Sequence, residues 1–116
     1  MKKKYYITTP IYYPSAKPHM GHAYSSISAD FIARYKRLEG YDVKFVTGTD
    51  EHGQKIQKSA DKKKLSPDVF CNEISKVFLD LTKTLNLSNT DFIRTTEDRH
   101  HKTVQKLWKI LEEKKF

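Results

Sequence analysis

The chain has 116 residues, enough for one domain of ordinary size or for part of a larger one. Hydrophobic residues make up 37% of it and charged residues 31%, which excludes an intrinsically disordered chain and favours a folded, water-soluble class. The 22 basic and 14 acidic residues give a net charge of +8, which favours an anionic partner such as a nucleotide or RNA, although solvated lysine faces produce the same excess.

The single cysteine, Cys71, excludes an internal disulfide and a zinc knuckle of the CxxC type, so a reducing compartment is expected. The basic residues 2–4 are followed by no apolar run long enough for a secretory signal or a membrane span. We therefore expect a cytoplasmic protein without a membrane partner.

The first part of the chain predicts a βαβ unit. Residues 4–9 are rich in β-formers and predict a buried strand, and residues 11–17 read as a loop. A helix is predicted from His19 until Gly40, and a second strand over 42–47. A unit of this size indicates an α/β fold with parallel strands and a right-handed crossover. Apolar residues recur in the helix at Met20, Tyr24, Ile27, Phe31, Tyr35 and Leu38.

The second part predicts further helices and one short strand. Residues 54–64 look helical and strongly basic, and Ser66 followed by Pro67 is typical of a helix start. That helix is expected to reach about Asn86, and residues 91–94 fit a short strand. Thr96 or a neighbour is expected to cap a last helix with Trp108 as a core residue. The stripe of this last helix comprises Val104, Leu107, Trp108 and Leu111.

Two loops that follow strands carry the candidate functional residues. The first loop leads to His19 and His22, and the second contains Asp50, Glu51 and His52. Because ligands of open parallel sheets bind beyond the carboxyl ends of the strands, these two loops are expected to border one crevice.

The two histidines have three interpretations. At a helix N-terminus they fit a phosphate clamp, and Gly21 would allow a close approach of the ligand. With His52 or Asp50 as a third donor they could bind zinc. In the third interpretation they are structural, one partly buried and the other exposed. The position at a strand-to-helix junction favours phosphate.

The remaining candidates stay ambiguous from the residues alone. Asp50 and Glu51 fit acid–base or metal chemistry, an ammonium-binding site, or an acidic turn that caps the next helix. Ile11 and Tyr13 fit either a small apolar pocket or the core, and Tyr12 shares that ambiguity. The GxxxxGK[ST], GxGxxG, GxSxG and HExxH motifs are absent from the sequence, which weakens the kinase, dinucleotide, hydrolase and zincin interpretations.

The segment TPIYYPSAKPHMGHAYSSISADFIARYKRLEGYDVKFVTGTDEHGQKI resembles methionyl-tRNA synthetases, a family of class I aminoacyl-tRNA synthetases. HMGH matches the HxGH motif of that class, and the combination of TPIYY with GTDEHG is more specific than HxGH alone. The resemblance implies a Rossmann-like nucleotide-binding fold of parallel strands and flanking helices. Residues 1–116 would be its N-terminal half, hence an incomplete catalytic domain.

The resemblance also implies a function and a set of site residues. The family activates methionine with ATP and Mg²⁺ to methionyl-adenylate and transfers it to tRNA(Met) for translation. His19 and His22 would be the catalytic, ATP-binding pair, with Gly21 beside the adenine. Ile11, Tyr13 and Asp50 would bind methionine.

The KMSKS motif and the zinc-bearing insertion of the family are absent from these residues. An isolated fragment would therefore be inactive, and no metal ligand is assigned. The alternatives are a non-catalytic nucleotide- or RNA-binding remnant and a metal-binding module built from His19, His22 and His52.

Overall fold

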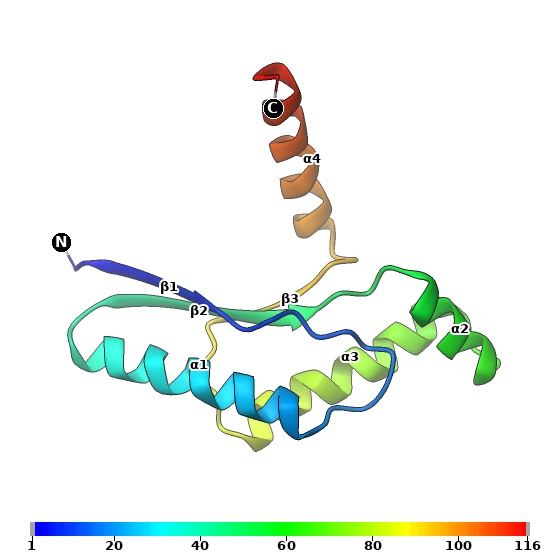
Figure 1. Ribbon diagram of the computed structural model, residues 1–116, viewed down its shortest axis with the longest axis horizontal. Helices are drawn as coiled ribbons and strands as arrows, with labels where there is room; N and C mark the ends of the chain where they lie inside the picture. Colours follow the sequence, from blue (N-terminus) through cyan, green and yellow to red (C-terminus); the bar gives the residue numbers. More distant parts are fainter. Residues whose placement is uncertain (1, 116) are drawn as a thin grey trace.

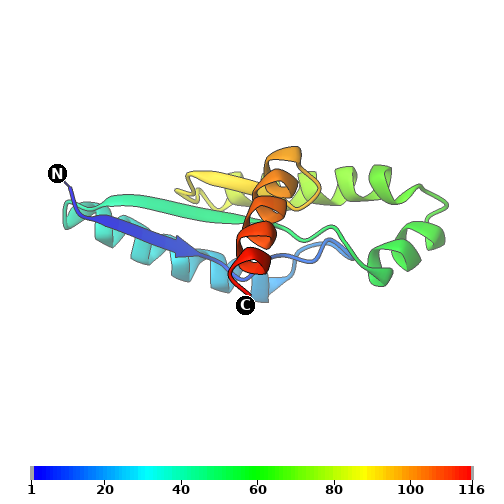
Figure 2. The ribbon, with the colours of Figure 1, turned by 90° about the horizontal axis from the view of Figure 1, so that it is seen from above.

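The computed structural model describes residues 2–115, which contain one parallel sheet. Strands β1 (Lys4–Thr8), β2 (Asp42–Thr49) and β3 (Asp91–Arg94) lie side by side in that order (Figure 2). Tyr6 pairs with Lys44 in the first ladder, and all the pairings are parallel. The α/β class and the short third strand are confirmed, and β2 extends two residues past its predicted end.

Helices connect the strands and cover one face of the sheet. Helix α1 (Met20–Leu38) joins β1 to β2, while α2 (Gln54–Lys62) and α3 (Pro67–Thr84) join β2 to β3. Figure 1 shows α1 and α3 beneath the sheet and α4 (Asp98–Glu113) standing away from its opposite side. The predicted βαβ unit is confirmed.

The helix ends follow the local sequence. Gly40 has a φ of 87°, the left-handed conformation that ends a helix without a Cβ penalty, one residue after the C-cap of α1. The Ser66 hydroxyl accepts a hydrogen bond from the Val69 N–H at 3.4 Å, and Pro67 occupies the first turn of α3. The cap of α4 is Glu97, the neighbour of Thr96.

The buried core consists of two clusters. One lies between α1 and β2 and is built from Ala29, Ala33, Val43 and Phe45. The other joins the loop after β1 to α2 and α3, and contains Tyr12, Ile56, Ala60, Phe70, Cys71, Ile74 and Phe78. The second cluster supports the loops that carry the candidate site.

Gly48 brings β3 close to β2 near the carboxyl edge. A Cβ built on Gly48 would lie 1.9 Å from the carbonyl oxygen of Ile93, so any side chain there would displace the strand. This contact fixes the position of Arg94, the last residue of β3.

Two predictions of burial are wrong. The first strand alternates between exposed and half-buried residues, because β1 is a sheet edge with helices on one face only. In α1 the buried residues are Ser26, Ala29, Asp30 and Ala33, small enough for close packing on the sheet. The apolar residues that recur at helical spacing along α1 are exposed.

The prediction that Trp108 belongs to the core is also wrong, because its side chain is 70% exposed. The whole of α4 is exposed apart from the half-buried His100. Within residues 2–115 we find no helix of sufficient length and apolar character to cross a membrane.

Candidate active site at the carboxyl edge of the sheet

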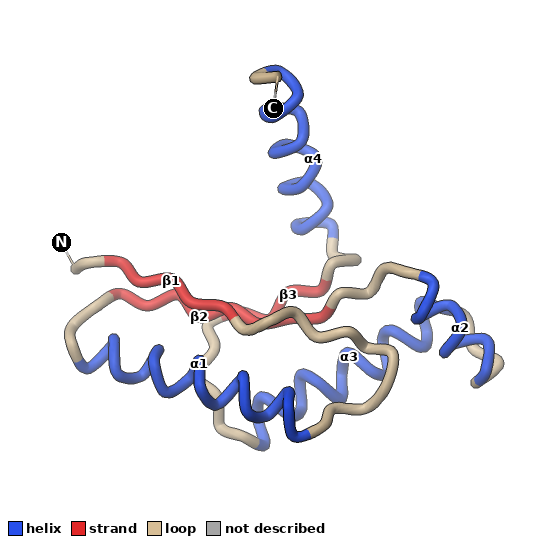
Figure 3. The backbone as a smooth tube through the Cα atoms, viewed as in Figure 1, coloured by secondary structure: helices blue, strands red, loops and turns tan. Residues whose placement is uncertain are grey.

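The loop after β1 ties the start of α1 to the end of β2 (Figure 3). The N–H of Tyr12 donates to the carbonyl of Gly48 at 2.9 Å, and the N–H of Asp50 donates to the carbonyl of Tyr12 at 2.8 Å. The Tyr12 ring lies 5.5 Å from the His22 ring between centroids. The two candidate loops therefore meet at one edge, at the carboxyl ends of β1 and β2.

His19 and His22 cap α1 reciprocally. The Nδ1 of His19 accepts the N–H of Gly21 at 3.1 Å, and the Nδ1 of His22 accepts the N–H of His19 at 3.1 Å. An imidazole whose Nδ1 accepts carries its proton on Nε2 when neutral. Each ring therefore presents an Nε2–H donor beside the positive end of the α1 dipole. This arrangement suits an anionic ligand.

The His22 ring packs against two aromatic side chains. The ring is nearly perpendicular to those of Tyr12 and Phe78, with centroids 5.5 and 5.1 Å away, and the Tyr12 and Phe78 rings stack on each other. Tyr12 is buried and its hydroxyl is hydrogen-bonded to Ser26, so the ambiguity over Tyr12 is resolved in favour of the core. Burial, followed by the neighbouring His19, lowers the pKa of His22 below its usual 6.5.

We expect His22 to be neutral at pH 7 and to titrate below 6.5, measured from its imidazole proton shifts by NMR. Replacing His19 with asparagine retains a capping oxygen and removes the nearby charge, so the His22 midpoint should rise but stay below 6.5 because burial remains. A His22 midpoint at or above 6.5 in the unmodified chain would contradict this packing. Because the unfolded chain binds this proton more tightly, the contribution of His22 to stability is lost as the pH falls below 6.5.

Gly21 is required by the cap itself. A Cβ at this position would lie 2.9 Å from Cε1 and 3.1 Å from Nδ1 of His19. Any side chain at position 21 would push the His19 ring off its hydrogen bond. The geometry of the cap alone therefore accounts for glycine at this position.

Glu51 is the most buried charged group at this edge, with a side chain 0% exposed. Arg94 donates to its two oxygens from Nε at 2.7 Å and from Nη2 at 3.0 Å. Three hydroxyl groups also donate to this carboxylate, those of Thr49, Ser75 and Thr96. The network joins β2, α3 and the segment after β3.

Burial alone would raise the pKa of Glu51, but the hydrogen bonds from Arg94 and the hydroxyl groups outweigh it and hold the pKa below the ordinary value. Helix α2 has Gly53 as its N-cap and no side-chain capping bond. The interpretation of Glu51 as a helix-capping residue is therefore wrong. It is an anchor that fixes the loop containing Asp50.

Asp50 and His52 share Thr95 as a partner. The Thr95 hydroxyl lies 3.2 Å from Nδ1 of His52 and 3.4 Å from Oδ1 of Asp50, and it accepts the N–H of Glu51 at 2.8 Å. The His52 ring also lies 5.9 Å from that of His101. Within residues 2–115, no three His, Cys, Asp or Glu side chains gather to hold a metal ion, so the geometry gives no support to the zinc module.

Ile11 and Tyr13 occupy different surroundings. Ile11 lines a hollow of about 320 Å³ on the uncovered face of the sheet, together with Thr9, Gly48 and His100. Tyr13 is 60% exposed beside the buried Tyr12. The structure thus brings Ile11 to the strand ends but leaves the Tyr13 side chain on the surface.

Comparison with known proteins gives the family. The family model described as tRNA synthetases class I (M) matches residues 5–116. The chain belongs to this family. It is 56% identical over 110 residues to the methionine–tRNA ligase of Listeria monocytogenes and 53% identical over 111 residues to that of Rickettsia conorii. These matches cover 95% and 96% of the chain but only 17% and 22% of the relatives.

The fold agrees with a solved synthetase structure. The Mycobacterium tuberculosis methionyl-tRNA synthetase bound by methionyl-adenylate superposes with a TM-score of 0.93 at 46% identity, covering 96% of this chain and 22% of that one. The chain therefore spans about a fifth of the synthetases that it matches. Its Rossmann-like class, with parallel strands and flanking helices, agrees with the predicted fold.

The anchoring residues of this synthetase chain do not follow from local sequence patterns. Arg94 and Thr95 lie in the predicted third strand and the residue after it, and Ser75 lies on the buried face of α3. Arg94 and Thr95 could have been suspected from their position, because ligands of parallel sheets bind beyond the carboxyl ends of the strands and these residues lie at the carboxyl end of β3. Nothing in the sequence around Ser75 indicates that it contacts the site.

Proposed function

We propose that this chain supplies ATP- and methionine-binding residues of a methionine–tRNA ligase, which converts methionine and ATP to methionyl-adenylate and then aminoacylates tRNA(Met). The observation that carries the proposal is the reciprocal cap of His19 and His22, which leaves two Nε2–H donors at the positive end of α1. Family membership supports the substrate class.

In this proposal the histidines act on the phosphates of ATP. The methionine carboxylate attacks the α-phosphorus, a new C–O–P linkage forms, and the bond to the bridging oxygen breaks as pyrophosphate leaves. Negative charge builds on the phosphate oxygens, and preorganised donors such as Nε2–H of His19 and His22 stabilise it. Gly21 would leave room for adenine, and Mg²⁺ would accompany ATP.

Asp50 is proposed to bind the methionine ammonium group. It is half-buried at the end of β2, and the adjacent Glu51 is held by Arg94, which keeps this loop in place. A carboxylate fixed in a crevice forms a charge-assisted hydrogen bond with an ammonium group. Ile11 and Tyr13 would line the pocket for the thioether side chain, where an aromatic ring suits sulfur.

The second step would transfer the methionyl group to a ribose hydroxyl at the 3′ end of tRNA(Met), releasing AMP. The free, buried thiol of Cys71 fits a reducing compartment, so we infer the cytoplasm.

The role of Asp50 can be tested in a hybrid ligase in which this chain replaces the matching segment of the Listeria monocytogenes enzyme. Asp50→Asn preserves shape and removes the charge, so methionine affinity measured by calorimetry should fall by about 10-fold to 100-fold, while ATP affinity changes little. Asp61→Asn, at an exposed position on α2, is the matched control and should leave both affinities unchanged. Unaltered methionine affinity in Asp50→Asn would remove Asp50 from the pocket.

A further inference from the structure

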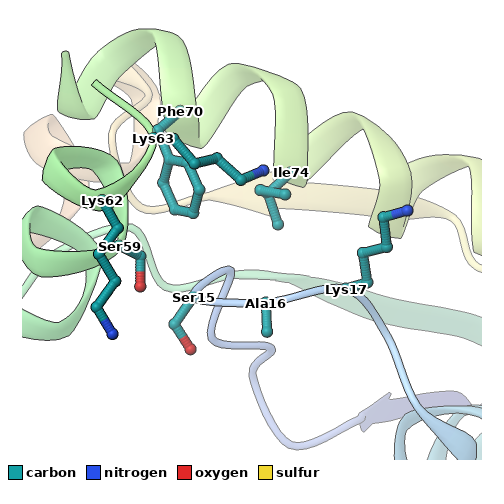
Figure 4. Close-up of a pocket in the computed structure, with 8 residues that line it drawn as sticks. All are labelled: Ser15, Ala16, Lys17, Ser59, Lys62, Lys63, Phe70 and Ile74. Carbon is teal, nitrogen blue, oxygen red and sulfur yellow. The ribbon is translucent and has the colours of Figure 1, made fainter. Parts of the chain in front are cut away.

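A second pocket lies on the side of the site loop that faces α2 and α3. It encloses about 420 Å³ between residues 15–17, the end of α2 and the start of α3. Figure 4 shows Lys17 and Lys62 at opposite sides of this pocket and Lys63 beside Phe70. The buried ring of Phe70 forms part of its apolar floor.

The charge of this pocket is positive and uncompensated. Three lysines line it, Lys17, Lys62 and Lys63, and its lining contains no acidic residue among those that the structure describes. None of the three lysines is ion-paired within residues 2–115. The hydroxyl groups of Ser15 and Ser59 add neutral donors to the lining of the pocket. Ammonium and hydroxyl donors together match phosphate oxygens.

The positive charge continues beyond the pocket along α2. Lys55, Lys58 and Lys62 are spaced three and four residues apart, so they share one face of the helix, and all are exposed. This row is about 10 Å long at 1.5 Å per residue. A single inorganic phosphate would engage only part of it, whereas consecutive phosphates of a nucleic-acid strand would follow it.

We infer that this pocket and the lysine row of α2 bind the phosphodiester backbone of a single RNA strand. The inference rests on the proposed function, because it locates a contact for the acceptor RNA, and it concerns a surface separate from the His19–His22 cap. Residue 17 precedes His19 by two positions, so a strand held here lies next to the proposed phosphate site. Lysine contacts to phosphates position a strand without reading its sequence.

The test is a fluorescence-anisotropy titration of a short, labelled single-stranded oligoribonucleotide with the 116-residue chain. Lys17→Met combined with Lys62→Met keeps the aliphatic stems and removes two charges. Affinity should fall at least 10-fold, and the slope of log affinity against log salt should become shallower by about 1.4, the value expected for two lost phosphate contacts. The matched control, Lys106→Met with Lys109→Met, removes two exposed charges from α4 and should cause a much smaller loss.

Equal losses in both double variants, or no loss in the pocket variant, would overturn the inference. Full displacement of the RNA by inorganic phosphate, under conditions where chloride of equal ionic strength does not displace it, would also overturn it by indicating a free-phosphate site. Circular dichroism of each variant confirms that the fold is retained, and the single variants Lys17→Met and Lys62→Met replace any double variant that unfolds. Loss of ATP–pyrophosphate exchange in the hybrid ligase would overturn the proposed function. The RNA-binding role of the pocket is tested separately, by the affinity for RNA.

Discussion

Arg94→Met is expected to lower the free energy of unfolding by about 3–5 kcal/mol, because it leaves the buried carboxylate of Glu51 without its charged partner. Domains of ordinary stability have only about 5–15 kcal/mol in total, so this one substitution should remove a large share. Urea denaturation followed by circular dichroism measures the change.

Arg99→Met is the matched control for this prediction. Arg99 also pairs with carboxylates, those of Asp91 and Glu97, but its side chain is 50% exposed, so its loss should lower the free energy of unfolding much less than the loss of Arg94. Adding Glu51→Gln to Arg94→Met removes the stranded charge and should recover part of the lost stability. Similar losses for Arg94→Met and Arg99→Met would contradict the anchoring role of Glu51.

The hydrogen-bond network of Glu51 predicts that the stability of the fold depends on pH. Because the pKa of Glu51 is lower in the folded chain than its ordinary 4.5, the unfolded chain takes up the proton first as the pH falls. The stabilising contribution of Glu51 is therefore complete above its ordinary pKa and is lost as the pH falls through its pKa in the folded chain.

Local patterns in the sequence were sufficient to predict the βαβ unit. The signals for this unit are short-range: the helical periodicity after His19, the glycine at position 40 and the β-formers on either side of the helix. Each signal determines the structure of the residues that carry it. The link between the two loops also followed from the sequence, because parallel strands end at one edge.

The choice of buried face did not follow from the sequence. In α1 the large apolar side chains point away from the sheet and the small residues around Ala29 and Ala33 pack on it, so hydrophobicity alone selects the wrong face. Apart from the nearby Thr49, the side chains that donate to Glu51 lie 24 to 45 residues away along the chain, beyond the reach of any local pattern. Their contact depends on the strand register and on the close approach at Gly48.

His22→Ala in the hybrid ligase is expected to slow methionyl-adenylate formation by about 100-fold to 1,000-fold, the loss typical of one preorganised donor to a developing negative charge. His19→Ala should have a similar effect on the rate and should also cost about 1 kcal/mol of stability, since it removes the cap of α1. Stopped-flow or quenched-flow adenylation assays give the rate, and calorimetry gives methionine affinity, which should change little.

His101→Ala is the control for the two histidine variants, because His101 is exposed on α4 and has no proposed role. It should adenylate methionine at the rate of the unmodified hybrid. An unchanged adenylation rate in His22→Ala, together with weakened methionine binding, would contradict the phosphate role.

Methionine-dependent ATP–pyrophosphate exchange in the hybrid ligase tests the central claim most directly, because it reports adenylate formation before any tRNA is added. We predict that exchange occurs, requires methionine, and is abolished or strongly reduced when His19 and His22 are replaced together. A folded hybrid that binds ATP without methionine-dependent exchange would contradict the account and would favour a non-catalytic nucleotide-binding module.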